Sequence, residues 1–123
     1  MRILELAKVP KYEYIFSIGD GYTSNCFVIT DKNELEKLLF YLKQFLANQY
    51  VNSALFENDY SIILETKGKF LIISIAYKIS PGKLFTLEFR LSKTECKKLV
   101  KIIEKEIKQK TKIIYRKELK FKK

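Results

Sequence analysis

Residues 70–99 read FLIISIAYKISPGKLFTLEFRLSKTECKKL, and this stretch predicts two strands followed by a helix. Apolar side chains alternate along residues 70–79 and again along residues 84–91. That period of two is typical of strands with one buried face. Residues 80–83, Ser-Pro-Gly-Lys, lie between them and suit a type II turn, with Pro at the first central position and Gly at the second. The stretch therefore predicts a β-hairpin.

A capping box predicts that a helix begins directly after this hairpin. Ser92 is followed three residues later by Glu95, so each side chain can bond the other residue's backbone N–H. Apolar residues then recur at helical spacing, which predicts one face packed on the sheet and one face exposed. The predicted buried face consists of Cys96, Leu99, Val100, Ile103 and Ile107.

The first half of the chain has the same layout. Residues 11–18 alternate like a strand, and Gly19-Asp20-Gly21 is a hairpin turn. Asp31 and Glu34 form another capping box, which predicts a helix from about residue 32 to residue 48. Further strands are predicted at residues 2–8 (a short edge strand), 22–30 and 60–66, and residues 111–121 fit either a last strand or an ordered tail.

A shift of 61 residues aligns the two halves. Two explanations fit this alignment: a duplicated βββα unit, with repeats at residues 1–50 and 60–110, or the common appearance of any hairpin that leads into a capped helix. On either explanation we expect a single α+β domain over residues 1–123, with an antiparallel β-sheet and two amphipathic helices on one face. The identical pairs are Ile18 and Ile79, Gly21 and Gly82, Glu34 and Glu95, Lys37 and Lys98, and Leu38 and Leu99.

Composition argues against an enzyme. The 123 residues contain no histidine, which excludes Ser-His-Asp and Cys-His catalysis within the chain and removes the commonest metal ligand. Cys26 and Cys96 fall at apolar positions, as expected of buried thiols in a reducing compartment. The apolar runs are too short to span a membrane, and we read no signal peptide. We expect no catalytic residues, no metal, no cofactor, no membrane partner and a cytoplasmic location.

Positive charge is concentrated near the C-terminus. Residues 97–123 carry 12 Lys/Arg against 3 Glu, a net of +9, whereas residues 1–96 carry 12 against 11, a net of +1. Such a surface suits a polyanion or an acidic protein, since lysines contact phosphates and release counterions. The predicted helix divides this charge into a rigid face and a basic arm at residues 111–123. The face holds Lys97, Lys98, Lys101, Lys105 and Lys108, and the arm supplies Lys112, Arg116, Lys117 and Lys120.

A second group combines an aromatic ring with basic side chains on the predicted sheet. Tyr60 lies near a strand end, and Lys67, Lys69 and Arg90 belong to the same region of the chain. Single-stranded nucleic acid is bound in this way, with bases stacked on rings and phosphates paired with cations. The alternative is an ordinary solvated sheet face with its neighbouring core aromatics.

The layout of residues 11–48 and 60–110 resembles the PUR-repeat and Whirly classes of single-stranded nucleic-acid-binding proteins. The resemblance implies an antiparallel sheet backed by helices, binding of single-stranded DNA or RNA, and a homodimer. Each half here shows at most three strands where those families have four, and no binding residue can be matched position by position. The composition is also similar to that of small proteins from thermophilic archaeal viruses and plasmids.

These features predict a non-enzymatic nucleic-acid-binding protein with low sequence specificity, because lysines offer point charges and do not read base edges. The alternative is a viral or mobile-element protein-interaction module that inhibits a host complex, for example a nucleoprotein defence complex in an infected cell. In that case the basic surface would bind an acidic protein or a nucleoprotein.

Overall fold

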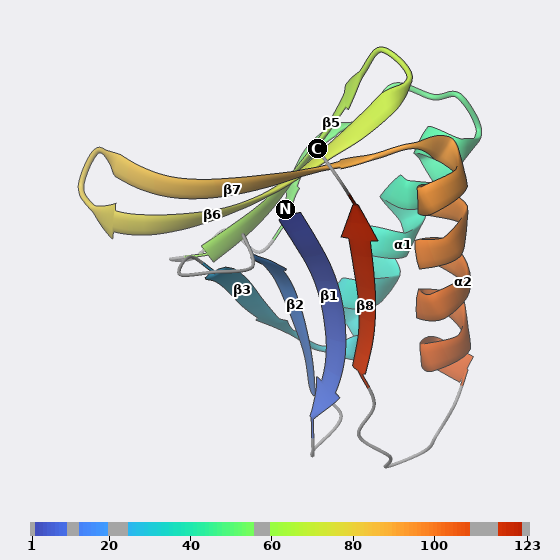
Figure 1. Ribbon diagram of the computed structural model, residues 1–123, viewed down its shortest axis with the longest axis horizontal. Helices are drawn as coiled ribbons and strands as arrows, with labels where there is room; N and C mark the ends of the chain where they lie inside the picture. The colour runs from blue at the N-terminus through green and yellow to red at the C-terminus, as the bar shows by residue number, and fades with distance from the viewer. Residues whose placement is uncertain (1, 10–12, 20–24, 56–59, 109–115, 122–123) are drawn as a thin grey trace.

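A computed structural model describes residues 2–9, 13–19, 25–55, 60–108 and 116–121, which form eight strands and two helices (Figure 1). The first half of the chain contributes β1 (Arg2–Val9), β2 (Glu13–Gly19), β3 (Asn25–Thr30), α1 (Lys32–Leu46) and β4 (Asn52–Leu55). The second half contributes β5 (Tyr60–Lys67), β6 (Phe70–Ser80), β7 (Lys83–Leu91), α2 (Lys93–Lys108) and β8 (Arg116–Phe121).

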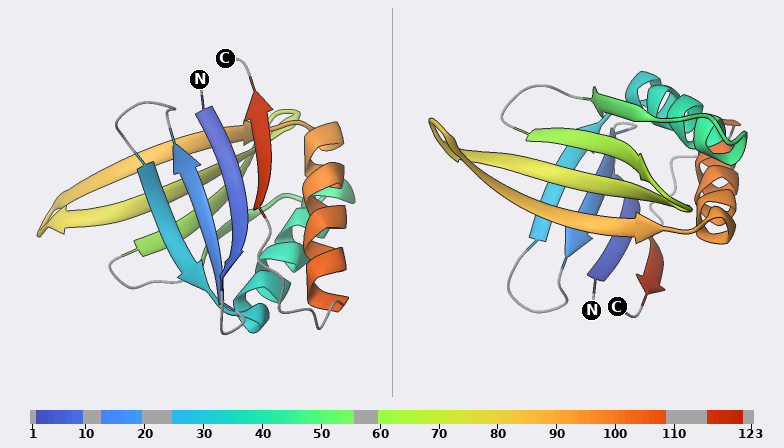
Figure 2. Two further views of the ribbon diagram at one scale, coloured as in Figure 1. Left: turned by 60° about the horizontal axis from the view of Figure 1, so that its bottom comes forward. Right: turned by 90° about the horizontal axis from the view of Figure 1, so that it is seen from above.

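The predicted α+β class is confirmed, and the strands are divided between two sheets where we expected one. The first sheet has the order β3-β2-β1-β8 and the second has the order β4-β5-β6-β7. Every pairing is antiparallel. The two sheets lie over one another with their strands crossing, as the views from below and above show (Figure 2).

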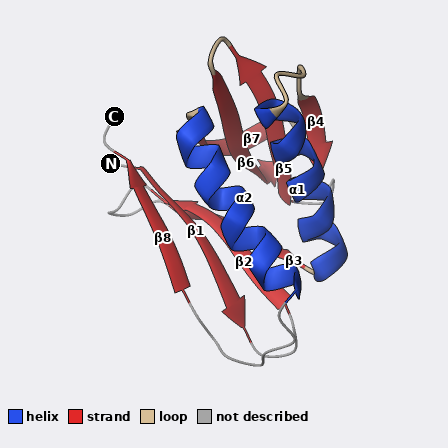
Figure 3. Cartoon of the chain, turned by 90° about the vertical axis from the view of Figure 1, so that its right-hand side faces the viewer, coloured by secondary structure: helices blue, strands red, loops and turns tan. Residues whose placement is uncertain are grey.

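Both helices lie side by side at the same end of the two sheets and run in opposite directions (Figures 1 and 3). Their apolar faces and the facing sides of the sheets form one hydrophobic core. Phe16 on β2, Phe45 on α1 and Phe89 on β7 are fully buried there. Because the core takes side chains from all these elements, neither sheet buries its apolar face by itself.

The two sheets have equivalent strand orders, with each strand of one sheet corresponding to the strand four places along the chain in the other. Moving each strand of β3-β2-β1-β8 four places along the chain, with β8 returning to β4, gives β7-β6-β5-β4. Each half is thus three strands, a helix and one further strand, and that further strand pairs in the other half's sheet. β4 pairs with β5, and β8 pairs with β1.

These exchanged strands correct two expectations. Residues 2–8 were expected to form an edge strand, but β1 lies between β2 and β8 and is paired on both sides. Each sheet has four strands, not the three per half that the hydrophobic pattern gave. β4 was not predicted at all, because Asn52-Ser53 looks like a helix terminator and not like the start of a strand.

The helix starts and the hairpin turn at residues 80–83 follow their sequence signals, whereas Asp20 and Gly21 of the other predicted hairpin turn lie outside the described residues. The Asp31–Glu34 and Ser92–Glu95 capping boxes both form, and the helices begin at Lys32 and Lys93. Gly82 has a φ of 81°, as the second central residue of a type II turn requires. Within the described residues no helix is long and apolar enough to cross a membrane.

Candidate nucleic-acid interface

One side of α2 presents five exposed lysines, which we call the α2 lysine stripe. At 100° per residue they fall within an arc of about 100°, and they extend over roughly 16 Å of helix. The opposite side is buried, with Cys96, Leu99 and Ile103 in the core. Because that packing fixes the rotation of the helix, the stripe must face solvent. Its members are Lys97, Lys98, Lys101, Lys105 and Lys108.

No carboxylate neutralises this stripe among the described residues. The ion pair found there joins Lys43 Nζ of α1 to Glu104 Oε2 of α2 at 3.3 Å, outside the stripe. Glu104 borders the stripe, three residues after Lys101 and four before Lys108, but its carboxylate pairs with Lys43 of α1. Five like charges within three helical turns repel one another, which costs folding free energy. An anionic ligand would relieve that repulsion.

The equivalent face of α1 is different, although the two helices occupy matching places in the fold. The shift of 61 residues superimposes the capped starts of α1 and α2. Only one of the five stripe lysines has a lysine at its equivalent position in α1. The residues that take these places are, in order, Glu36, Lys37, Phe40, Gln44 and Ala47. The lysines are therefore not a requirement of the repeated architecture.

The predicted C-terminal arm is partly a strand of the first sheet. Residues 116–121 form β8, whose backbone pairs with β1 from Arg2 opposite Phe121 to Ala7 opposite Arg116. Arg116, Lys117 and Lys120 thus have backbone positions fixed by the sheet. Lys112 lies outside the described residues, as do the last two residues of the chain.

The second predicted group, Tyr60 with Lys67, Lys69 and Arg90, occupies two separate places in the structure. Lys67 and Lys69 are exposed on either side of the β5–β6 turn, whose Gly68 has a φ of 58°. Arg90 on β7 lies on the same end of the sheet, with its guanidinium carbon 4.6 Å from the centroid of the Phe70 ring. These three basic residues are brought together at the end of the sheet that leads into α2.

Tyr60 lies at the other end of β5. Lys67 lies seven positions further along the strand, which is about 23 Å at the rise of a β-strand. Its ring is half-buried and stacks on Tyr77, with centroids 4.8 Å apart and an angle of 29° between the planes. The structure therefore separates this aromatic residue from the basic residues that it was grouped with.

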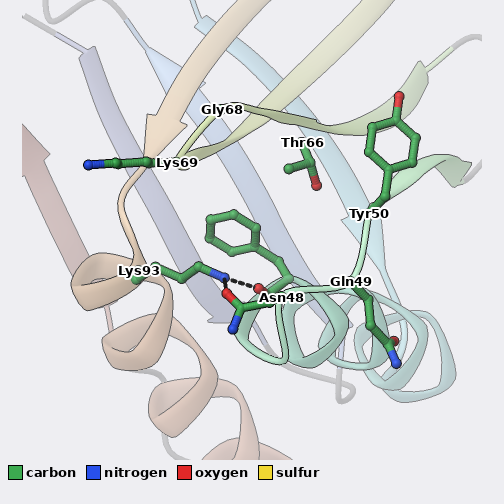
Figure 4. A pocket seen from close by; sticks show the side chains of 8 residues that line it. Asn48, Gln49, Tyr50, Thr66, Gly68, Lys69 and Lys93 are labelled. Atoms are coloured by element: carbon green, nitrogen blue, oxygen red, sulfur yellow. Dashed lines mark hydrogen bonds between the residues drawn. The ribbon is translucent and has the colours of Figure 1, made fainter.

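A pocket of about 370 Å³ opens where the end of α1, the β5–β6 turn and the start of α2 meet (Figure 4). Of its lining residues only Lys69 was a predicted site residue; Lys93, Asn48 and Tyr50 were not singled out. Asn48 carried a usable signal, because Asn just after an apolar helical run commonly takes the left-handed conformation that ends a helix. The lining comprises Phe45, Asn48, Gln49, Tyr50, Thr66, Gly68, Lys69 and Lys93.

Lys93 is held at the wall of this pocket by the C-terminal end of α1. Its ammonium donates hydrogen bonds to the Phe45 carbonyl oxygen and to Asn48 Oδ1, the latter at 3.0 Å. It also lies 4.1 Å from the centroid of the Phe45 ring. A cation at this point complements the negative end of the α1 dipole, and its two hydrogen bonds use two of the three ammonium protons.

A scan of protein-family models finds none that matches this chain, and a search of curated proteins finds no match either. A function for the protein must therefore come from the chemistry of the surfaces described above.

Proposed function

We propose that the protein is a non-enzymatic nucleic-acid-binding protein that uses the α2 lysine stripe to bind backbone phosphates. The observation that carries the proposal is the asymmetry between the helices. Two helices that share a capping box at the N-terminus and pack on the same core differ in that α2 alone carries five exposed lysines on its outer side. Selection for solubility would not distinguish α2 from α1, whereas selection for an anionic partner would.

Low sequence specificity follows from the residue type. An ammonium is a point charge without the planar fork that lets arginine bond two acceptors of one base. A rigid row of such charges on about 16 Å of helix matches the repeating charge of a sugar–phosphate backbone. Lys67, Lys69 and Arg90 continue the positive surface beyond the start of α2.

The experiment is a salt titration of binding. A fluorescein-labelled single-stranded 20-mer is titrated with wild-type protein at several salt concentrations, and anisotropy gives the dissociation constants. Each phosphate contact contributes a slope of about −0.7 in log affinity against log salt. Replacing Lys97, Lys101, Lys105 and Lys108 by Gln should make the slope shallower by up to about 3 and weaken binding at low salt by at least tenfold.

The matched control removes the same charge elsewhere. Lys32, Lys37, Lys78 and Lys83 are exposed on α1 and on the β6–β7 hairpin, so their replacement by Gln lowers the net charge equally. We expect this control to change the slope by less than half as much as the stripe variant. Equal slopes for the two variants would show a general charge effect and contradict the proposal, as would wild-type binding that does not respond to salt.

A second candidate function is a protein-interaction module that binds an acidic protein or a nucleoprotein. The observation that favours it is the apolar end of the β6–β7 hairpin, which extends past the first sheet (Figure 1). Ile79 and Leu84 are 60% and 65% exposed there, and Tyr77 is also exposed. A single stoichiometric protein partner that survives nuclease treatment, and that is lost on Ile79→Ser plus Leu84→Ser, would favour this candidate.

A further inference from the structure

The pocket between the two helices is built from rigid backbone. Asn48 takes a φ of 61°, and the Asn48 and Gln49 amides donate to the Phe45 and Gln44 carbonyls at 3.1 and 3.0 Å. These two bonds are those of a Schellman motif, which closes the end of α1. The backbone at Val51 is fixed as well. The Thr66 amide donates to the Val51 carbonyl oxygen at 2.9 Å, and the Val51 amide donates to Thr66 Oγ1 at 3.0 Å.

Tyr50 lies between these two fixed points and is nevertheless 68% exposed. An aromatic side chain on such a backbone loses little further conformational entropy when it binds a ligand. In Figure 4 its ring is on the side of the pocket opposite to Lys69 and Lys93. The pocket thus has an exposed aromatic side chain on one side and two lysines on the other. The Lys93 ammonium points toward Asn48, and the side chain of Lys69 extends outward from the edge of the pocket (Figure 4).

The side chains that line the pocket indicate which class of ligand it can bind. The ring of Tyr50 can stack on a planar π system, as nucleobases do on aromatic side chains. The Asn48 amide accepts from Lys93 through Oδ1 and keeps its two N–H donors for another partner. Lys69 and Lys93 supply positive charge for a phosphate. A volume of about 370 Å³ lies within the range of small-ligand sites.

The pocket is also continuous with the α2 lysine stripe. Lys93 precedes Lys97 by one helical turn, which is about 6 Å along the axis. A backbone bound along the stripe therefore needs only one or two more nucleotides to reach the pocket, at about 3.4 Å or more per nucleotide. A base in a duplex is stacked between its neighbours and paired with its partner, so only an unpaired base can enter the pocket.

We propose that this pocket binds one unpaired nucleotide of the strand that the α2 lysine stripe holds, with the base stacked on Tyr50 and the phosphate between Lys69 and Lys93. This inference rests on the proposed function and adds selectivity for single strands and for overhanging ends. Phosphate contacts along the stripe provide affinity, and the pocket distinguishes an unpaired base from a paired one.

The test compares full-length Tyr50→Ala, Tyr50→Phe and Phe40→Ala on three ligands: a single-stranded 20-mer, a blunt 20-bp duplex and that duplex with a three-nucleotide overhang. Phe40 is the matched control, because it is 58% exposed on α1 outside the pocket lining. We expect Tyr50→Ala to weaken binding of the single strand and of the overhang duplex by about tenfold. On the blunt duplex the loss should be less than twofold, and Tyr50→Phe should keep most of the single-strand affinity.

The outcomes separate this inference from the proposed function. If the stripe variant loses binding while Tyr50→Ala and Phe40→Ala behave alike on all three ligands, the pocket proposal is overturned and the stripe remains. If wild-type protein binds none of the three ligands, the proposed function itself fails. Competition provides a second readout: a free mononucleotide should displace the overhang duplex at lower concentration than inorganic phosphate does. Equal potency would mean that the pocket recognises only an anion, which also overturns the proposal.

Discussion

Cys96 lies at the contact between the two helices, where its thiol donates a hydrogen bond to the Leu42 carbonyl oxygen at 3.6 Å. Burial raises the pKa of this thiol from 9.0 to about 12, and the nearby Lys93 ammonium opposes the shift. The buried thiol predicted from the helical pattern is thus confirmed for Cys96. The side chain of Cys26 lies outside the described residues.

This shift predicts a loss of stability at high pH. The unfolded chain releases the thiol proton near pH 9, whereas the folded protein keeps it until about pH 12. The contribution of the group is therefore complete below pH 9 and is lost as the pH rises toward 12, at up to about 1.4 kcal/mol per pH unit. Urea unfolding at pH 7.5, 9 and 10.5 should show a steeper decline for wild type than for Cys96→Val. If the free energy of unfolding fell equally with pH for wild type and Cys96→Val, this prediction would be wrong.

Glu106 is a charged residue on the buried face of α2 and was not included in the predicted buried face. It is 4% exposed, and its Oε2 has no hydrogen-bond partner among the described residues. The carboxylate lies close enough to Tyr14 to raise the pKa of that phenol, after the larger effect of burial. The equivalent residue in α1 is Phe45, a core side chain. Helical spacing places Glu106 on the same face as Leu99 and Ile103, and the predicted buried face left it out because that face contained apolar residues and a cysteine only.

At the scale of elements, local signals located the beginnings of the helices better than their ends. Both capping boxes formed because each needs only residues three apart in sequence. The end of α1 was expected near residue 48 and lies at Leu46, since the left-handed Asn48 closes the helix. Weak alternation left residues 111–121 open as a last strand or an ordered tail, and residues 116–121 form the strand β8. Strand β4 was not predicted, because it has four residues and its partner β5 follows it across a separate segment.

The two capping boxes give a paired stability prediction. Asp31→Ala and Ser92→Ala each remove the side-chain acceptor of the third helical N–H, and each should lower the free energy of unfolding by about 1 kcal/mol. Asn33→Ala and Thr94→Ala are matched controls two residues after each cap, where both side chains are exposed, and they should be neutral or slightly stabilising. Urea denaturation measures all four. A cap variant no less stable than its control would refute the role of that cap.

At the scale of the whole molecule, the candidate site could be predicted only in part. The α2 lysine stripe follows from 3.6-residue periodicity, so its exposure was foreseeable from the sequence. The pocket was not, because Tyr50, Lys69 and Lys93 come from three segments that meet only when β4 pairs with β5 and α1 packs on α2. Tyr60 and Lys67 were grouped because they are close in sequence, yet a straight strand keeps them apart.

The exchange of β4 and β8 ties both halves into one folding unit, which makes β8 a structural element as well as a source of charge. A chain ending at residue 115 leaves β1 with an unpaired edge and removes six residue pairs of ladder. We expect it to lose roughly 3 kcal/mol or more of unfolding free energy and to self-associate through that edge. Full-length Arg116→Gln, Lys117→Gln, Lys120→Gln removes the charge but keeps the strand, so its urea midpoint should stay near that of wild type while its nucleic-acid affinity falls. A truncated chain that unfolds at the wild-type midpoint and stays monomeric in analytical ultracentrifugation would show that β8 is dispensable for the fold.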